Sequence, residues 1–162
     1  MPTSRKIAAV IVAQLALTPV AHAACNDTQP DTRYALNGAE VYDSKTNLTW
    51  QRCSLGQTWS ENKCTGSVTG MTWDQANKAA QSAKSGWRLP TRQELQSVLQ
   101  NTCGLSPGDK LVFPDLDIMY STYWSATTSE PALAWLVGFN NASTFNGFRT
   151  APNAVRLVRT GK

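Results

Sequence analysis

Hydrophobic and polar residues alternate along several short runs of the chain, and each run predicts a strand. Residues 41–43 and 48–51 form the first pair, with a polar turn at 44–47 between them. Asn37 and Gly38 mark an earlier turn. Four later runs also predict strands, at residues 123–127, 134–139, 144–149 and 154–159. The period of two therefore lies mostly in the last third of the chain.

Between these two groups of strands the apolar period becomes that of a helix. Thr72 and Gln75 have the spacing of a capping box, which predicts a helix that ends near residues 84–86. Its apolar face is narrow and consists of Trp73, Ala76, Ala80 and Ala83.

Residues 86–95 predict the end of one element and the start of the next. Trp87 and Leu89 alternate as in a short buried strand, which Pro90 ends. Thr91 and Glu94 form a second capping box and predict a helix over residues 91–101. The apolar face of this helix contains Leu95, Val98 and Leu99.

A long irregular loop is expected at residues 103–119, which contain Pro107 and Pro114. The order is thus strands, two helices, a loop, and then antiparallel strands. Such an order indicates an α+β fold, with two helices packed on a twisted antiparallel sheet. We expect the first and last strands to pair and close the domain.

The first residues have the pattern of a secretion signal. Basic Arg5 and Lys6 precede a largely apolar stretch, and residues 21–23 supply a small-x-small cleavage pattern. We therefore expect a signal peptide at residues 1–23 and one domain at 24–162, exported to the periplasm, the cell surface or the medium. The alternative is a lipoprotein acylated at Cys25, although His22 stands where a lipobox has an aliphatic residue.

Charge and hydropathy exclude two classes of partner. Removing Arg5 and Lys6 lowers the formal net charge from +4 to about +2, which argues against a nucleic-acid partner. No later apolar segment is long enough for a membrane span of about 20 residues.

Four cysteines remain after the predicted cleavage, and an exported chain normally pairs them as disulfides. Three pairings are open, of which we favour Cys53–Cys64 and Cys25–Cys103. The first would close a loop rich in Gly, Ser and Asn, with about 3 kcal/mol of stabilisation. Metal ligation is the alternative, but there is no C-x-x-C pair, so no metal site and no cofactor are expected.

Histidine is absent from the predicted domain, because His22 lies in the signal. Ser-His and Cys-His nucleophiles and His-ligated zinc are thereby excluded, and we expect the protein not to be an enzyme. Asp115 and Asp117 could form a carboxylate pair for glycoside hydrolysis or calcium binding. The simpler interpretation is a solvated turn after Pro114.

Six tryptophans suggest where the core lies. Core-facing positions are expected for Trp50, Trp73, Trp87 and Trp135. Trp59 differs, because it lies in the Cys53–Cys64 loop among polar residues. It either packs back on the domain or stays exposed to stack on a sugar or a protein partner.

Several of these motifs together resemble the DUF1566 family, which is also known as the C-terminal domain of the Legionella collagen-like adhesin (Lcl). The resemblance covers roughly residues 34–159. Its anchors are residues 48–53, Trp73 with Ala76, residues 87–90, residues 123–125, Ala134 with Trp135, and residues 155–159. It implies a C-type-lectin-like fold, related to that of formylglycine-generating enzymes, and an extracellular setting in bacteria.

Functional motifs of the related folds do not carry over. The only Gln-Pro-Asp, residues 29–31, lies at the wrong end for the calcium loop of a sugar-binding lectin. The strand at residues 124–126 lacks the lectin carboxylate. No cysteine follows Cys103, whereas formylglycine-generating enzymes use cysteines near their C-terminus.

Residues 140–149 form the candidate binding surface, because they mix amides, hydroxyls, aromatics and an arginine. The predicted contacts are Asn140, Asn141, Phe145, Asn146, Phe148, Arg149 and, separately, Trp59. An ordinary polar hairpin is the alternative interpretation.

The leading hypothesis is an exported, non-enzymatic binding module for adhesion or surface recognition of a glycan or protein. A family relative that binds sulfated polysaccharides implies an anionic glycan, with charge from Arg149 and Arg156. The second hypothesis is an accessory subunit of a pilus or other surface assembly. The third is an enzyme of the formylglycine-generating type.

Overall fold

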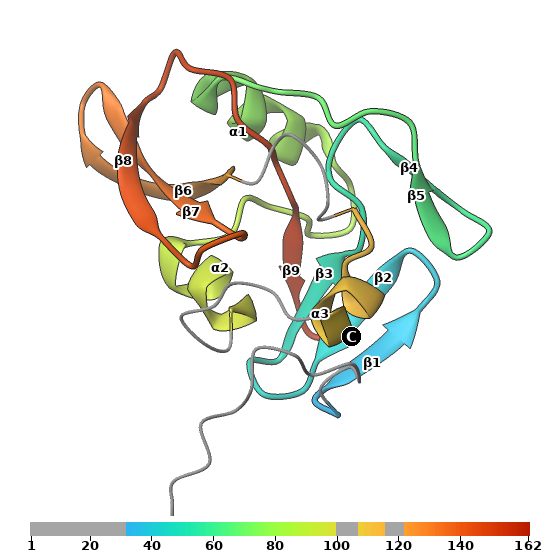
Figure 1. Cartoon of the computed structure of the whole chain (residues 1–162). Coiled ribbons are helices and arrows are strands. Elements are labelled where there is room, and N and C mark those ends of the chain that lie inside the picture. The colour runs from blue at the N-terminus through green and yellow to red at the C-terminus, as the bar shows by residue number, and fades with distance from the viewer. Residues whose placement is uncertain (1–31, 100–106, 116–121) are drawn as a thin grey trace, which may run out of the picture.

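The computed structural model describes residues 32–99, 107–115 and 122–162 (Figure 1). Within these ranges the fold is α+β with antiparallel sheets, as predicted. The strands are β1 (Tyr34–Asn37), β2 (Glu40–Asp43), β3 (Leu48–Gln51), β4 (Thr58–Ser60), β5 (Lys63–Thr65), β6 (Thr122–Glu130), β7 (Leu133–Gly138), β8 (Thr144–Phe148) and β9 (Val158–Thr160). The helices are α1 (Trp73–Ser82), α2 (Arg92–Val98) and α3 (Pro107–Val112). The predicted signal, Cys25, Cys103, Asp117 and residues 29–31 lie outside the described residues.

Two sheets and one hairpin make up the strand framework. The first sheet has the order β1-β2-β3-β9. The last strand closes the domain, but it pairs with β3 and not with the first strand. The second sheet has the order β6-β7-β8, and β4 and β5 form a separate hairpin. The register places Val41, Trp50 and Val158 side by side on the core face of the first sheet.

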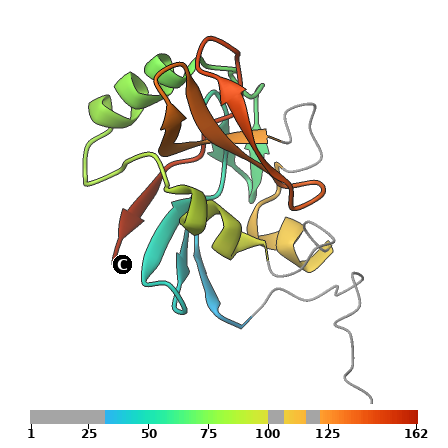
Figure 2. The same ribbon diagram turned by 90° about the vertical axis from the view of Figure 1, so that its left-hand side faces the viewer.

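Helices α1 and α2 cover opposite faces of the β6-β7-β8 sheet (Figures 1 and 2). On the α1 face, Trp124 and Leu136 pack with Ala76 and Ala80. On the α2 face, Tyr123 and Val137 join a larger core cluster with Leu95, Val98 and the inner face of the first sheet. The alternating register of β6 and β7 therefore supplies two cores from one sheet.

Both predicted capping boxes are present. The Thr72 hydroxyl accepts a hydrogen bond from Gln75 N, and the Gln75 side chain accepts one from Thr72 N. Thr91 and Glu94 exchange the same pair of bonds at α2. Helix α2 ends at Val98, three residues earlier than predicted.

The long loop predicted over residues 103–119 is wrong in part, because α3 lies within it. Pro107 is tolerated there, since a first-turn residue needs no N–H donor. Arg52 satisfies two carbonyls at the other end, through Nη2 to Leu111 O and Nε to Val112 O, at 2.7 and 2.8 Å. A helix of six residues has too few turns to reveal a period in the sequence.

The Cys53–Cys64 loop contains the β4-β5 hairpin, with Trp59 directly opposite Cys64. One other expectation needs correction. The strand predicted over residues 154–159 is regular only from Val158. The segment before it runs between the sheets and bonds to both: Leu157 O accepts from Gln51 N of β3, and Ala154 O accepts from Trp124 N of β6. The sequence of this segment alternates as a strand would, but in the fold the segment has no single strand beside it to pair with.

Candidate functional site

A buried ion pair lies where the two sheets meet. Arg156 Nη2 is 2.5 Å from Asp115 Oδ1, and neither side chain is exposed to solvent. Ser54 donates from its backbone N and its hydroxyl to Asp115 Oδ2, at 2.7 and 2.6 Å, and the Tyr123 hydroxyl lies 2.9 Å from Ser54 Oγ. Arg156 Nη1 donates to the carbonyls of Gln51 and Arg52. This cluster connects β3, β6 and the segment before β9.

The electrostatics of this cluster follow from its burial. Burial alone would lower the pKa of Arg156, but the charges and hydrogen bonds of Asp115 and Tyr123 together outweigh burial, and the pKa is raised. Burial also raises the pKa of the Tyr123 hydroxyl. A charged Arg156 that is fully enclosed has no access to an outside ligand.

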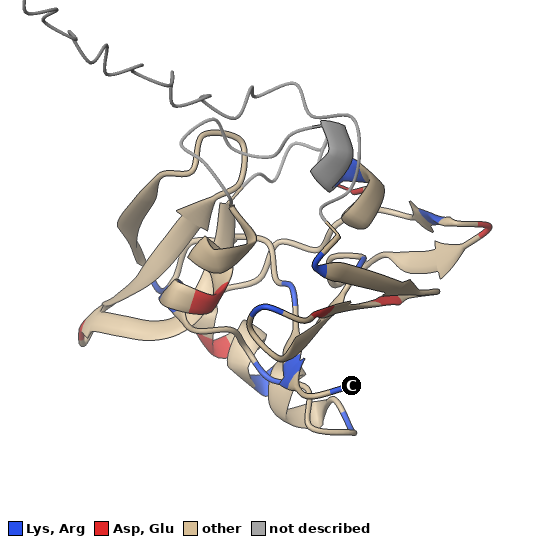
Figure 3. Ribbon diagram, turned by 90° about the horizontal axis from the view of Figure 1, so that it is seen from below, with Lys and Arg blue, Asp and Glu red and all other residues tan. Residues whose placement is uncertain are grey.

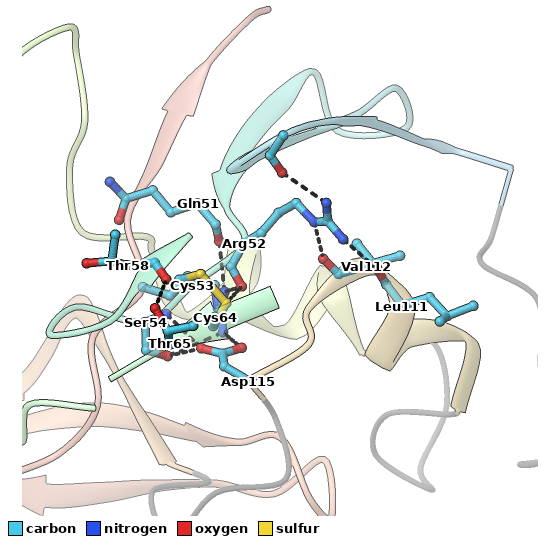
Figure 4. The surroundings of a disulfide bond; sticks show 12 residues. Gln51, Arg52, Cys53, Ser54, Thr58, Cys64, Thr65, Leu111, Val112 and Asp115 are labelled. Atoms are coloured by element: carbon cyan, nitrogen blue, oxygen red, sulfur yellow. Dashed lines mark hydrogen bonds and ion pairs between the residues drawn. A yellow bond between two sulfur atoms is a disulfide. The ribbon is translucent and has the colours of Figure 1, made fainter. Parts of the chain in front are cut away.

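Beside this cluster, the disulfide Cys53–Cys64 closes the β4-β5 hairpin, as predicted (Figure 4). The Arg52 guanidinium lies 4.1 Å from the centroid of the Trp59 ring. Nη1 of the same guanidinium donates to Gly38 O at 2.9 Å. The hairpin and its indole are therefore fixed to the first sheet, which matches the interpretation that Trp59 packs back on the domain.

One face of Trp59 nevertheless lines a pocket. This Trp59 pocket has a volume of about 210 Å³. Its walls are Ala39, Glu40, Gln51, Cys53, Ser54, Leu55, Gln57, Trp59 and Trp87. Gln57 Oε1 is buried there and has no hydrogen-bond partner among the described residues.

A second pocket lies on the outer face of the first sheet. This Tyr42 pocket has a volume of about 230 Å³ and is lined by Ala35, Leu36, Asn37, Glu40, Tyr42, Thr49, Arg159 and Lys162. Cross-strand pairing places Ala35, Tyr42, Thr49 and Arg159 in one row across the four strands. Lys162 Nζ lies 5.0 Å from the centroid of the Tyr42 ring.

Glu40 lines both pockets, so they form one surface feature, which we name the Glu40 groove. Arg159 Nη2 donates to Glu40 Oε2 at 2.7 Å, and its guanidinium lies 5.0 Å from the centroid of Trp87. Figure 3 shows Lys and Arg segments of the ribbon gathered near the C-terminal end of the chain, where Arg159 and Lys162 lie. The groove thus combines three aromatic side chains with one carboxylate and two cationic side chains.

The residues predicted at 140–149 lie on β8 and its two ends, and β8 is an edge strand. Phe148 and Phe145 are among the most exposed large hydrophobic side chains of the described residues, at 67 % and 42 %. Alternation places Asn146 and Phe148 on the α2 face of the sheet, whereas Phe145 lies on the α1 face, opposite Leu136. The two phenylalanines therefore belong to different faces.

The remaining predicted residues near β8 have local structural contacts. Asn141 Oδ1 accepts hydrogen bonds from the backbone N and the hydroxyl of Ser143 and fixes the β7–β8 turn. Arg149 pairs with Asp74 and lies 4.0 Å from the ring centroid of Trp73. Asn140 is exposed. Figure 1 places Trp59, on β4, on the opposite side of the molecule from β8, so the structure does not bring it to these residues. A binding role for this surface stays a prediction.

Two predictions about charged residues are wrong. Arg156 cannot supply charge to an anionic glycan, because it is fully buried in its pair with Asp115. Asp115 is not in a solvated turn, since only 2 % of it is exposed. Neither the alternation around Arg156 nor the proline before Asp115 indicates burial, because burial depends on their pairing with each other.

The tryptophans fall into two groups. Trp50 and Trp124 are fully buried. The other three tryptophans that were predicted to face the core are half-buried. An arginine guanidinium lies over each of their indoles: Arg149 over Trp73, Arg159 over Trp87 and Arg92 over Trp135. A tryptophan that covers the core with one face and meets an arginine with the other gives the same sequence pattern as a fully buried one.

Sequence reasoning missed most of the groove, namely Glu40, Tyr42, Gln57, Trp87 in this role, Arg159 and Lys162. The available signal was the outer face of the first strand pair, where Glu40 and Tyr42 alternate with buried Val41 and Asp43. That alternation predicts which side faces outward. It does not predict that Trp59 and Trp87 complete the wall.

Most of the acidic side chains in the described part of the chain form ion pairs with arginines. Glu40, Asp43, Asp74, Glu94 and Asp115 each form an ion pair with an arginine. In residues 32–99, 107–115 and 122–162 there is no group of three or more His, Cys, Asp or Glu that could hold a metal ion. The same part of the chain contains no helix long and apolar enough to cross a membrane.

A family model described as the Lcl C-terminal domain matches residues 39–159 of the chain. The match confirms the resemblance predicted from the six short motifs, and its range includes most of the Glu40 groove and the whole of β8. No match to a curated protein was found.

Proposed function

The chain belongs to the Lcl C-terminal domain family, and from that premise we propose that it is an exported, non-enzymatic recognition module that binds a glycan in the Glu40 groove. The observation that carries the proposal is the pair of pockets joined at Glu40, with Trp59 and Trp87 in one and Tyr42 in the other. Aromatic rings stack on the apolar faces of sugar rings, while amides and carboxylates bind hydroxyl groups.

Pocket size favours an extended ligand. Each pocket is smaller than the range of about 300–1,000 Å³ typical of drug-sized ligands. Adjacent residues of an oligosaccharide can occupy the two pockets, with Glu40 between them. The partly exposed Gln57 side chain in the wall of the Trp59 pocket would meet a sugar hydroxyl through its amide nitrogen.

Charge favours an acidic group at one end of the glycan. Arg159 and Lys162 line the Tyr42 pocket, and Glu40 pairs with Arg159, so the pocket carries one positive charge more than it carries negative charge. A carboxylate or sulfate on the sugar in the Tyr42 pocket would pair with these two side chains. The Trp59 pocket contains no Arg or Lys and suits a neutral ring.

Export and a C-type-lectin-like arrangement are part of the same proposal. The Cys53–Cys64 disulfide supports an oxidising compartment. The lectin-like arrangement has support from the α+β class and from the pairing of β9 with β3, which brings the end of the chain back to its beginning. The pairing of the acidic side chains with arginines supports a binding role over acid–base catalysis.

A glycan array with three proteins tests the proposal. We expect the unmodified protein to bind acidic oligosaccharides and Gln57→Leu with Trp59→Ala to lose that binding, because a side-chain amide and the stacking face are removed from the pocket wall. Phe148→Ala is the matched control, since it removes an exposed aromatic side chain elsewhere. Loss of binding in the control alone would move the site to β8, and equal binding by all three would contradict the proposal.

A further inference from the structure

Strand β8 leaves backbone groups open at the edge of its sheet. Among the described elements it pairs only with β7 (Figures 1 and 2). Gly138 N donates to Ser143 O, and Arg149 N donates to Ala132 O, which fixes the alternation of the ladder between them. By that alternation, Phe145 and Gly147 bond to β7. The backbone groups of Thr144, Asn146 and Phe148 therefore point outward, and only Phe148 O has a local donor, Ala151 N.

This edge lacks the features that normally prevent strand pairing. Edge strands are protected by lysines, prolines, inward-pointing charges or bulges. The sequence of β8 is Thr-Phe-Asn-Gly-Phe, with neither charge nor proline, and its register with β7 runs without a shift. An uncharged, regular edge with two exposed phenylalanines is suited to another strand.

We propose that two copies of this chain form a dimer by antiparallel pairing of β8 with β8, centred on Asn146. A two-fold axis at Asn146 makes each copy donate Asn146 N–H to the partner's Asn146 carbonyl. It also directs Phe148 N–H to the partner's Thr144 carbonyl. The two sheets of the pair then become continuous, and the outward N–H groups of Thr144, Asn146 and Phe148 each gain an acceptor in the partner.

Side chains on β8 are complementary under the same two-fold axis. Phe145 of one copy stands opposite the partner's Gly147, on the same face of the sheet. Gly147 has no side chain to block that ring, and Leu136 Cδ1 already occupies the place of a Cβ, 2.5 Å from it. An aromatic residue across from an edge glycine is a favourable pairing. On the other face, Phe148 stands opposite the partner's Thr144, and the two Asn146 amides meet.

The dimer is independent of the Glu40 groove, because Figure 1 places β8 away from β1 and β2. It goes beyond the proposed glycan binding, and either can fail without the other. Self-pairing is also the kind of contact that a subunit of a surface assembly requires.

Sedimentation equilibrium over a concentration series tests the dimer. We expect the unmodified protein to dimerise and Asn146→Lys to raise the dissociation constant about tenfold or more, because two like charges meet on the axis. Asn140→Lys is the matched control with the same change of charge at an exposed position, and it should leave the dissociation constant unchanged. Mixing Asn146→Lys with Asn146→Asp should restore a dimer that contains one copy of each.

Three results would overturn the proposal. The first is an unmodified protein that stays monomeric up to about millimolar concentration. At that concentration even a weak dimer, with a Kd near 1 mM, would be populated. The second is an undiminished dimer in Asn146→Lys. The third is an absence of mixed dimers while thermal melts show both variants folded, since the opposite charges would then not face each other.

Discussion

The Glu40 groove and the β8 edge are two exposed regions of one small domain with opposite construction. The groove is concave, its Glu40 and Arg159 are paired, and a disulfide with the Arg52 contacts fixes its wall. The β8 edge is flat and uncharged, and it leaves backbone groups without partners in the chain. A concave surface with fixed aromatics suits a small ligand, whereas an open strand suits another strand.

The difference also extends below the surface. Ser54 lines the Trp59 pocket and at the same time contacts Asp115, Tyr123 and Arg156, so the buried ion pair forms the floor of the groove. Beneath β8 lie only β7 side chains and one apolar cluster. Changes at the groove should therefore cost stability, and changes at the β8 edge should not.

The largest expected effect comes from Arg156→Met. Removing the guanidinium leaves Asp115 buried and unpaired, which should lower the free energy of unfolding by about 3–5 kcal/mol. Urea denaturation measures the loss. The control is Arg149→Met, which breaks the exposed pair with Asp74 and should cost about 1 kcal/mol. Equal losses in the two variants would remove the contrast between the buried floor and the surface.

Opening the disulfide has the next largest effect. Cys53→Ser with Cys64→Ser should lower the free energy of unfolding by about 3 kcal/mol, because the unfolded chain regains the freedom of an 11-residue separation. The same variant should weaken glycan binding, since Cys53 lines the pocket and Trp59 lies in the hairpin. Self-association should stay the same. A variant with full glycan affinity would show that the disulfide does not hold the groove in shape.

Acid should selectively weaken the capping box of α2, the helix behind the β8 sheet. Burial acts to raise the pKa of Glu94, but hydrogen bonds from Arg88 and Thr91 outweigh it, so its pKa lies below the ordinary value of 4.5. A lowered folded-state pKa adds stability above pH 4.5, and this stability is lost as pH falls through the folded-state pKa. Glu94→Gln should thus be less stable by about 1 kcal/mol at pH 7.

Thermal melts at pH 7 and pH 2 test the sign of this effect. The difference between Glu94→Gln and the unmodified protein should narrow from pH 7 to pH 2, because Glu94 loses its charge as pH falls through its lowered folded-state pKa. Glu130→Gln, at the exposed end of β6, is the control and should differ little at either pH. A deficit that stays as large at pH 2 would mean that the carboxylate charge is not its cause.

The smallest expected effect on stability is at β8 itself. Phe148→Ser should change the free energy of unfolding by no more than about 0.5 kcal/mol, since two thirds of Phe148 is exposed. Leu136→Ala, on the neighbouring strand, should cost about 2–5 kcal/mol because Leu136 is 3 % exposed. Urea denaturation compares them. A large loss in Phe148→Ser would mean that this ring supports the fold.

Sequence reasoning succeeded where the signal is local. Both capping boxes, the strand pair β2-β3 and the Cys53–Cys64 disulfide depend on residues close together in the chain. It failed where partners are far apart, as for Arg156 with Asp115 and for Arg149 with Trp73. No local pattern distinguishes an arginine that meets solvent from one that meets a distant carboxylate or indole.

The Glu40 groove shows the same limit for the site. Glu40 and Tyr42 come from β2, Trp59 from the disulfide hairpin, Trp87 from the stretch before α2, and Arg159 from the last strand. Only Trp59 was chosen from the sequence, since an indole among polar residues is conspicuous by itself. Each of the other residues looks like an ordinary strand or core position in its own segment. They meet only in the folded domain, where β9 pairs with β3 and brings Arg159 beside β2.

The most direct test of the groove is a nuclear magnetic resonance titration of the six indole N–H signals with the best glycan from the array. If the glycan binds in the Glu40 groove, the Trp59 and Trp87 signals shift with one common dissociation constant, while those of Trp73 and Trp135 stay unchanged. Shifts confined to Trp73 and Trp135, with Trp59 and Trp87 unaffected, would contradict it.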